Sequence, residues 1–175
     1  MSKTITVDVF DTASIQAAIR QLEAYKRWLN DKAEELKQRV ALLIATNARE
    51  IFNNAVADDL INEAAIIGNV DVTVEHNGNV TLVIAKGEDA VFMEFGAGVY
   101  HNGSVGSSPN PLGANLGFTI GSYGLGNGAK NAWGFKDENG DLHLTHGVPA
   151  SMPMYRSMMA VVNNIEQIAR EVFST

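Results

Sequence analysis

The sequence contains no cysteine, so neither a disulfide framework nor a thiolate metal site can form. Long apolar runs are also missing: no stretch of about 18 apolar residues occurs, and the N-terminus has no apolar segment of signal-peptide length. We therefore expect a protein that neither spans a membrane nor carries a cleavable export signal. Glycine and proline are absent before Gly68, which leaves that part of the chain without helix breakers.

Positive charge is scarce as well. Thirteen Lys and Arg residues stand against twenty Asp and Glu residues, for a net charge of -7, and the basic residues are interleaved with acidic ones. This distribution disfavours sequence-specific DNA binding, although an acidic inner wall past which DNA slides would fit it. The length of 175 residues and the hydrophobic fraction of 46% predict one folded domain over residues 1–175.

An apolar stripe at alternating steps of three and four residues predicts one very long helix over about residues 14–56. At about 1.5 Å per residue this helix would be roughly 60 Å long, more than one small domain can cover with its own chain. We therefore expect the stripe to contact a neighbouring subunit, with Leu29 and Leu36 as candidate contacts. A break near Asn30-Asp31 is the alternative. The stripe holds Ile15, Ala18, Ile19, Leu22, Tyr25, Leu29, Ala33, Leu36, Val40, Leu43, Asn47 and Ile51.

The strand signals lie outside this helix. Alternation predicts a first strand over Thr4 to Phe10, and two Asn-Gly turns predict hairpins. One hairpin joins residues 70–75 and 80–85, and the other joins residues 133–136 and 142–145. Ser151 is the expected cap of a closing helix. The predicted fold class is therefore α+β, in which an antiparallel sheet of about four to six strands packs against the long N-terminal helix and the C-terminal helix.

A glycine-rich segment interrupts this pattern. Residues 96–131 hold ten of the sixteen glycines and one formally charged residue, Lys130, so residues 99–131 are predicted to form a long loop or arm without a packed layer. Its apolar members, with Phe118 and Tyr123 as candidate subunit contacts, favour an arm that becomes ordered on a neighbouring subunit. A loop folded back over its own sheet is the alternative.

Few residues suggest chemistry. Glu94 stands between Met93 and Phe95 in an apolar run, where burial would raise its pKa or require a hydrogen-bond donor. We expect it either to face solvent or to accept hydrogen bonds from backbone amides near Gly96. The four histidines, His76, His101, His143 and His146, lack the spacing and partners of a zinc site. No nucleophile motif or phosphate-binding loop occurs, and we expect no cofactor and no metal.

Three features resemble the tail-component, or tail-completion, family of long-tailed bacteriophages (siphophages). The first is the order of elements. The second is the segment from Phe92 to Gly98, Phe-Met-Glu-Phe-Gly-Ala-Gly, which resembles the family's aromatic-Glu-Phe-Gly-(Thr or Ser)-Gly element. The third is the segment from Gly147 to Arg156, with Pro149 and Pro153, which is similar to the entry of the family's last helix. Ala97 departs from the pattern, and so does Met154, which stands where the family often has an aromatic residue.

The resemblance implies a structural protein of the virion and not an enzyme. Members join the head connector to the tail tube, so the expected partners are copies of the chain itself, in a ring, and the neighbouring connector and tail-tube proteins. DNA would pass through the ring without sequence-specific binding. The protein would be found in the virion and, during assembly, in the host cytoplasm, and its gene could belong to a prophage. The implied structural positions are Glu94, Phe95, Gly96, Gly98, Pro149 and Pro153.

Two other functions stay open from the sequence. The first is a small hydrolase that uses Glu94 with His101 or His143. The second is a host-encoded regulatory or toxin-like binding module of similar fold. If a variant with Glu94 replaced stayed folded but lost catalytic turnover, the hydrolase would be indicated. The neighbouring genes would distinguish a binding module from an assembly protein.

Overall fold

The computed structural model describes seven stretches of the chain. Four helices and four strands lie in them, in the order α1, β1, β2, α2, α3, β3, β4 and α4. The chain divides into two compact units. The first comprises residues 1–40 and 165–175, and the second comprises residues 41–164. The described residues are 4–57, 70–87, 89–96, 108–116, 133–136, 139–145 and 149–174.

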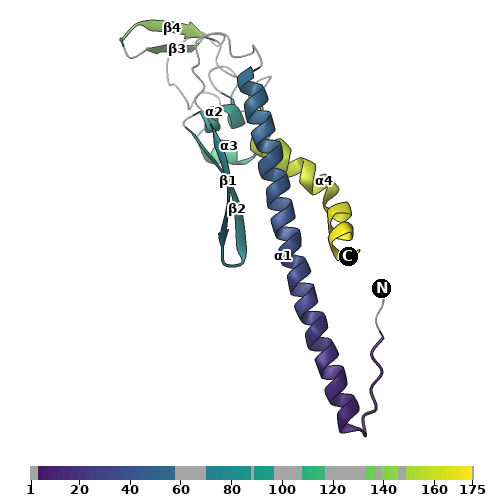
Figure 1. Cartoon of the computed structure of the whole chain (residues 1–175). Coiled ribbons are helices and arrows are strands. Elements are labelled where there is room, and N and C mark those ends of the chain that lie inside the picture. Colours follow the sequence, from purple (N-terminus) through teal and green to yellow (C-terminus); the bar gives the residue numbers. More distant parts are fainter. Residues whose placement is uncertain are drawn as a thin grey trace. The chain divides into compact units, whose positions relative to one another are not determined.

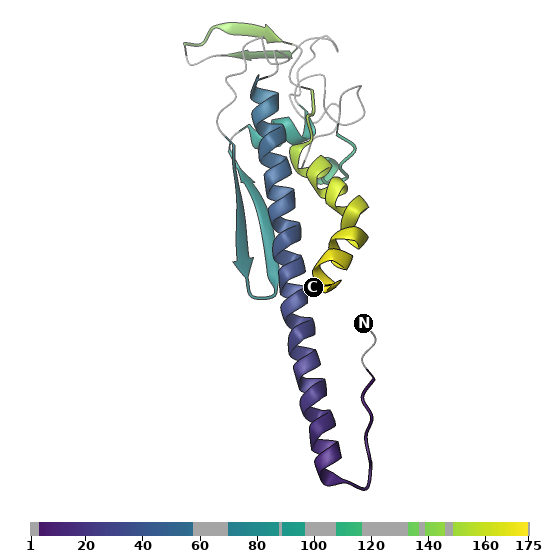
Figure 2. The same cartoon turned by 45° about the vertical axis from the view of Figure 1, so that its right-hand side comes forward.

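Helix α1 runs from Thr12 to Ala57 without interruption (Figures 1 and 2), so the expected long helix is confirmed and the break near Asn30-Asp31 does not occur. Its N-terminus is fixed by Asp11, whose carboxylate accepts hydrogen bonds from the amides of Ala13 at 2.9 Å and Ser14 at 3.3 Å. These bonds satisfy amides that have no partner inside a helix.

The expected strand over Thr4 to Phe10 is wrong. Residues 4–8 have no regular secondary structure, and residues 9 and 10 form a turn. The Asp8 side chain accepts a hydrogen bond from the Phe10 amide at 2.9 Å, and the Asp8 amide donates to the Ser14 hydroxyl at 2.9 Å. Alternation alone therefore misleads here, because local side-chain bonds to the backbone replace the partner strand that a ladder needs.

The first hairpin is confirmed. Strands β1 (Asp71–Asn77) and β2 (Val80–Lys86) pair antiparallel with Val72 opposite Ala85 and Val74 opposite Val83. Gly78 in the turn has φ 58°, the left-handed conformation that the Asn-Gly signal predicts. Across the strands, Lys86 donates to Glu75 at 2.8 Å, and this hydrogen bond and the carboxylate charge raise the pKa of Lys86.

The second hairpin has the predicted bounds, with β3 at Trp133–Lys136 and β4 at Leu142–Thr145. Within the described residues the two hairpins form separate two-stranded sheets. The expectation of one sheet with four to six strands is therefore wrong, while the α+β class, with an antiparallel sheet packed against helices, is confirmed.

Residues 90–95, the apolar run that holds Glu94, form a short helix, α2 (Ala90–Phe95). The three-residue spacing of Ala90 and Met93 places both side chains in the core. Gly96 ends the helix with φ 82°, and its amide donates to the Phe92 carbonyl at 2.8 Å. A second short helix, α3, covers Leu112–Asn115.

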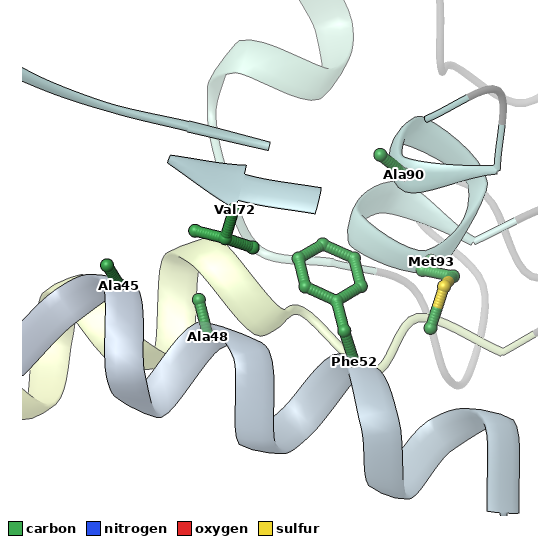
Figure 3. Packing of buried hydrophobic residues seen from close by; sticks show 6 residues of the cluster. All are labelled: Ala45, Ala48, Phe52, Val72, Ala90 and Met93. Atoms are coloured by element: carbon green, nitrogen blue, oxygen red, sulfur yellow. The ribbon is translucent and has the colours of Figure 1, made fainter. Parts of the chain in front are cut away.

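The core of the second unit joins three elements (Figure 3). Ala45, Ala48 and Phe52 of α1 pack against Val72 of β1 and against Ala90 and Met93 of α2. Figure 3 shows the Phe52 ring between Val72 and Met93. The small alanine side chains on α1 let the hairpin approach closely. Five half-buried apolar side chains pack against the edge of this cluster. These are Val70, Val74, Val83, Ala85 and Met154.

Helix α4 covers Pro153–Ser174. Among its apolar residues, Val161, Ile168 and Val172 are buried, whereas Met158 and Ile165 are exposed. In the first unit, Phe173 meets the Trp28 ring edge-on with centroids 6.0 Å apart, and Arg39 pairs with Glu171. None of the described helices is long and apolar enough to cross a bilayer.

Candidate functional site

The two sequence segments that carry the family resemblance meet in the second unit, at the junction between α2 and the start of α4. The Met93 carbonyl at the end of α2 accepts three hydrogen bonds. The donors are the amides of Ser151 at 3.0 Å and Met152 at 3.1 Å and the Ser151 hydroxyl at 3.2 Å. We call this junction, with Glu94 and the residues that contact it, the α2–α4 joint.

Glu94 is the centre of the joint. Only 6% of its surface is exposed. Oε2 accepts a hydrogen bond from the Met154 amide at 2.8 Å, and Oε1 accepts one from the Tyr155 amide at 3.0 Å and one from Asn110 Nδ2 at 3.4 Å. The carboxylate therefore caps the free amides at the N-terminus of α4, where the helix dipole favours negative charge.

The backbone at this helix start is unusual. Met152 has φ 56°, and it is the only non-glycine residue with positive φ among those the structure describes. Its carbonyl accepts the first helical hydrogen bond, from the Arg156 amide at 2.9 Å. Pro153 follows, buried, at a position where its missing N–H has no helical partner to lose. The Ser157 hydroxyl donates to the Pro153 carbonyl at 2.6 Å.

Ser151 is not the side-chain cap of α4 that we expected, because its hydroxyl donates to the Met93 carbonyl. The carboxylate of Glu94, 60 residues before Met154 in the chain, caps α4 instead. Rules for helix caps consider only the residues next to the helix start, so they cannot predict a cap that comes from a distant part of the chain.

Part of the glycine-rich segment completes the joint. Within residues 108–116, Ser108 and Gly113 are buried and Asn110 donates to Glu94, whereas Leu112 and Leu116 are exposed. A Cβ added to Gly113 would lie 3.0 Å from Cδ1 of Phe95, so the absence of a side chain lets α3 approach this ring. The expectation of a loop without packing is therefore wrong at Ser108, Asn110 and Gly113. The rest of residues 99–131 lies outside the described residues.

Asn110 and Gly113 are not among the positions predicted from the sequence, although the residues around Asn110 carry a turn signal. The run Ser108-Pro109-Asn110-Pro111 combines cap and turn residues. In the structure the Asn110 amide donates to the Ser108 hydroxyl at 3.2 Å, and the Leu112 amide donates to Asn110 Oδ1 at 3.1 Å. Asn110 thus both caps α3 and donates to Glu94.

The other predicted positions are scattered. Phe95 is buried, Gly96 ends α2 and Pro149 is half-buried. Leu29 is 42% exposed on α1, whereas Leu36 is half-buried. Three further candidates, Gly98, Phe118 and Tyr123, lie outside the described residues.

The described histidines lie in the two hairpins. His76 Nδ1 lies 3.1 Å from the Thr81 hydroxyl across the first hairpin, and His143 belongs to β4. His101 and His146 lie outside the described residues. Among the described side chains no three His, Asp or Glu residues gather closely enough to hold a metal ion.

Compared with known proteins, the chain matches no family model, no curated protein and no solved structure. The resemblance to tail-completion proteins stays a prediction from the sequence.

Proposed function

We propose that this protein is a structural assembly protein of a long-tailed bacteriophage, which forms a ring at the head-tail junction or the tail end. The α2–α4 joint carries the proposal. The two segments that resemble the tail-completion family are tied together by hydrogen bonds from Ser151 to Met93, which is 58 residues earlier, and from Met154 to Glu94. Motif residues with such contacts serve to build the subunit.

The surroundings of Glu94 favour an architectural role over proton transfer. Its two oxygens together accept three hydrogen bonds, two of them from backbone amides that would otherwise lack partners. A general base needs an oxygen within reach of a substrate proton. A carboxylate that already holds the N-terminus of a helix would release that helix when it moved toward a substrate.

Helix α1 supplies surface for assembly. Five large apolar side chains between Ile15 and Leu29 are exposed, each by at least 37%. Exposed apolar surface of this extent is typical of protein contacts. A cyclic ring needs two different complementary faces on each subunit, and Leu29 and Leu36 are the candidates for one of them.

In this proposal the partners are other copies of the chain and the neighbouring connector and tail-tube proteins, in the virion and in the host cytoplasm during assembly. DNA passes through the ring without sequence-specific contacts, because a chain of net charge -7 repels the phosphate backbone on average.

Negative-stain electron microscopy of the purified chain tests the proposal. Closed rings whose class averages share one rotational symmetry are the expected result. Single particles of subunit size at every concentration, also after addition of connector and tail-tube proteins, would refute it.

A further inference from the structure

The first hairpin has one closed edge and one open edge. Arg49 of α1 donates to the Val72 carbonyl of β1, from Nε at 3.0 Å and also from Nη2, so this carbonyl points away from β2. Along an antiparallel pair, residues that bond each other alternate with residues whose amides and carbonyls point outward. By the register, the outward groups of β2 belong to Thr81, Val83 and Ala85. Within the described residues no third strand pairs with β2, so its edge is open.

Strand β2 lacks the features that protect an open edge. Residues 80–85, Val-Thr-Leu-Val-Ile-Ala, contain no charge, no proline and no glycine, whereas natural edge strands often carry lysine, proline or a bulge. The strand is also apolar on both faces. Val83 and Ala85 pack against the core, and on the other face Val80 is 54% exposed and Leu82 43% exposed. This pattern is typical of a strand in the interior of a sheet.

Residues 4–7 have the matching properties, and we call them the donor segment. Thr4 and Thr6 alternate with Ile5 and Val7, as in a strand with one apolar face. In the single chain the segment has no regular secondary structure, and Val7 is 40% exposed. The side-chain bonds that shape the turn before α1 begin at Asp8, so they leave the backbone of the donor segment available for pairing.

The donor segment cannot reach β2 of its own chain. Helix α1 begins at Thr12 and runs unbroken past Arg49, which contacts β1. These two residues lie about 55 Å apart along the helix, at about 1.5 Å per residue. Residues 4–11 span at most about 28 Å even when fully extended. The donor segment and the β2 edge can therefore meet only between two copies of the chain.

We propose that the donor segment of one copy pairs antiparallel with the edge of β2 in a second copy and becomes the third strand of that sheet. The chain itself carries both halves of this contact, a strand pattern without a partner and a sheet edge without a partner. In the register that places apolar beside apolar, Val7 stands opposite Leu82 of the second copy. Thr6 then stands opposite Val83 and exchanges backbone hydrogen bonds with its outward amide and carbonyl.

This pairing deepens the proposed function and rests on it in one respect, the closure of the copies into a ring. The donor segment and the β2 edge are two different surfaces, as a cyclic assembly requires, and they add to the contact through α1. The strand pairing itself needs only two copies. Loss of the ring and loss of the pairing are therefore separate experimental outcomes.

Disulfide crosslinking of full-length cysteine variants tests the pairing, and the absence of native cysteine gives a clean background. A mixture of Val7→Cys and Leu82→Cys chains, oxidised with copper-phenanthroline, should give covalent dimers. Directly opposite side chains have Cβ atoms about 4.5–5.5 Å apart, close enough for a disulfide to form with a small adjustment. Neither variant alone should crosslink, because neither residue lies beside its own copy in this arrangement. Both positions are exposed in the single chain, so the substitutions should not unfold it.

The matched control replaces Leu82→Cys by Glu75→Cys. Glu75 stands opposite Leu82 inside the hairpin, one strand further from the donor segment and about 10 Å from Val7 in the pairing. A mixture of Val7→Cys and Glu75→Cys chains should therefore give no disulfide.

A second pair of variants tests the backbone bonds. In the Val7→Cys chain, Thr6→Pro removes the amide that donates to Val83 of the second copy, and it should slow crosslinking roughly tenfold. Thr6→Ala keeps this amide and should crosslink at the original rate. Circular dichroism should be the same in both, since residues 4–8 have no regular secondary structure in the single chain.

A chain that carries both Val7→Cys and Leu82→Cys separates pairing between copies from pairing within one chain. Covalent multimers of three or more chains are the expected result. Monomers closed by an internal disulfide would overturn the proposal, and so would equal crosslinking to Glu75→Cys and Leu82→Cys. Rings in electron micrographs without these crosslinks would overturn the strand pairing and leave the ring, whereas crosslinked multimers without rings would support the pairing and refute the ring.

Discussion

Oε2 of Glu94 accepts a hydrogen bond from the backbone amide of Met154 at 2.8 Å, although the two residues are 60 positions apart in the chain. The bond joins α2 to the start of α4. Because the neighbouring Tyr155 amide bonds to the other oxygen, one buried carboxylate fixes the first turn of the closing helix.

Replacing Glu94 should destabilise the fold. Glu94→Ala leaves two amides and Asn110 without their acceptor, and we expect a loss of about 1–3 kcal/mol in the free energy of unfolding. Glu94→Gln retains one acceptor oxygen and should lose less. Glu166→Ala, which removes an exposed partner of Arg170, is the control and should change stability by less than about 0.5 kcal/mol. Urea unfolding measures all three. Wild-type stability in Glu94→Ala would contradict the capping role.

Gly113 should not tolerate a side chain. Gly113→Ala places a Cβ 3.0 Å from Cδ1 of the buried Phe95, so we expect a loss of about 1 kcal/mol despite the better helix propensity of alanine. In a Phe95→Leu background the same substitution should cost less, because the ring that it meets is gone. A double-mutant cycle in thermal unfolding measures this coupling, and additive effects would show that the two residues do not touch.

Two leucines of α1 should differ in how they affect the protein. Leu29→Asp should reduce assembly and leave the melting temperature nearly unchanged, since Leu29 is exposed in the single chain. Leu36→Asp should reduce assembly and also lower the melting temperature, because Leu36 is half-buried. Lys32→Ala lies between them and should affect assembly least. Light scattering and thermal unfolding separate the two effects. Equal assembly in all three variants would exclude α1 as a contact surface.

The glycine-rich segment should contribute to stability through its packed middle part. Replacing residues 101–129 with a short Gly-Ser linker removes Ser108, Asn110 and Gly113, and with them the Asn110 bond to Glu94. We expect a lower melting temperature. Replacement of residues 117–129 alone keeps these contacts and should lower it less. Equal melting temperatures for the wild type and the longer replacement would show that residues 108–116 contribute nothing to the fold.

Sequence patterns correctly predicted those helices and hairpins that are determined by residues close together in the sequence. The stripe of α1 and the Asn-Gly turns near Gly78 and Gly140 specify their structures through neighbours in sequence. The strand expected at Thr4 to Phe10 was wrong, because a hydrogen bond from the Asp8 amide to the Ser14 hydroxyl holds that backbone in a different conformation. The capping of α4 by Glu94 could not be predicted, since it depends on a contact across 60 residues.

The molar mass of the purified chain in size-exclusion chromatography with light scattering, over a concentration series, tests the central claim most directly. Ring formation predicts a species whose mass is a fixed whole multiple, three or more, of the 18.8 kDa chain, and whose share grows with concentration. A mass of one chain at every concentration would contradict the ring. A mass that stops at two chains would contradict it as well.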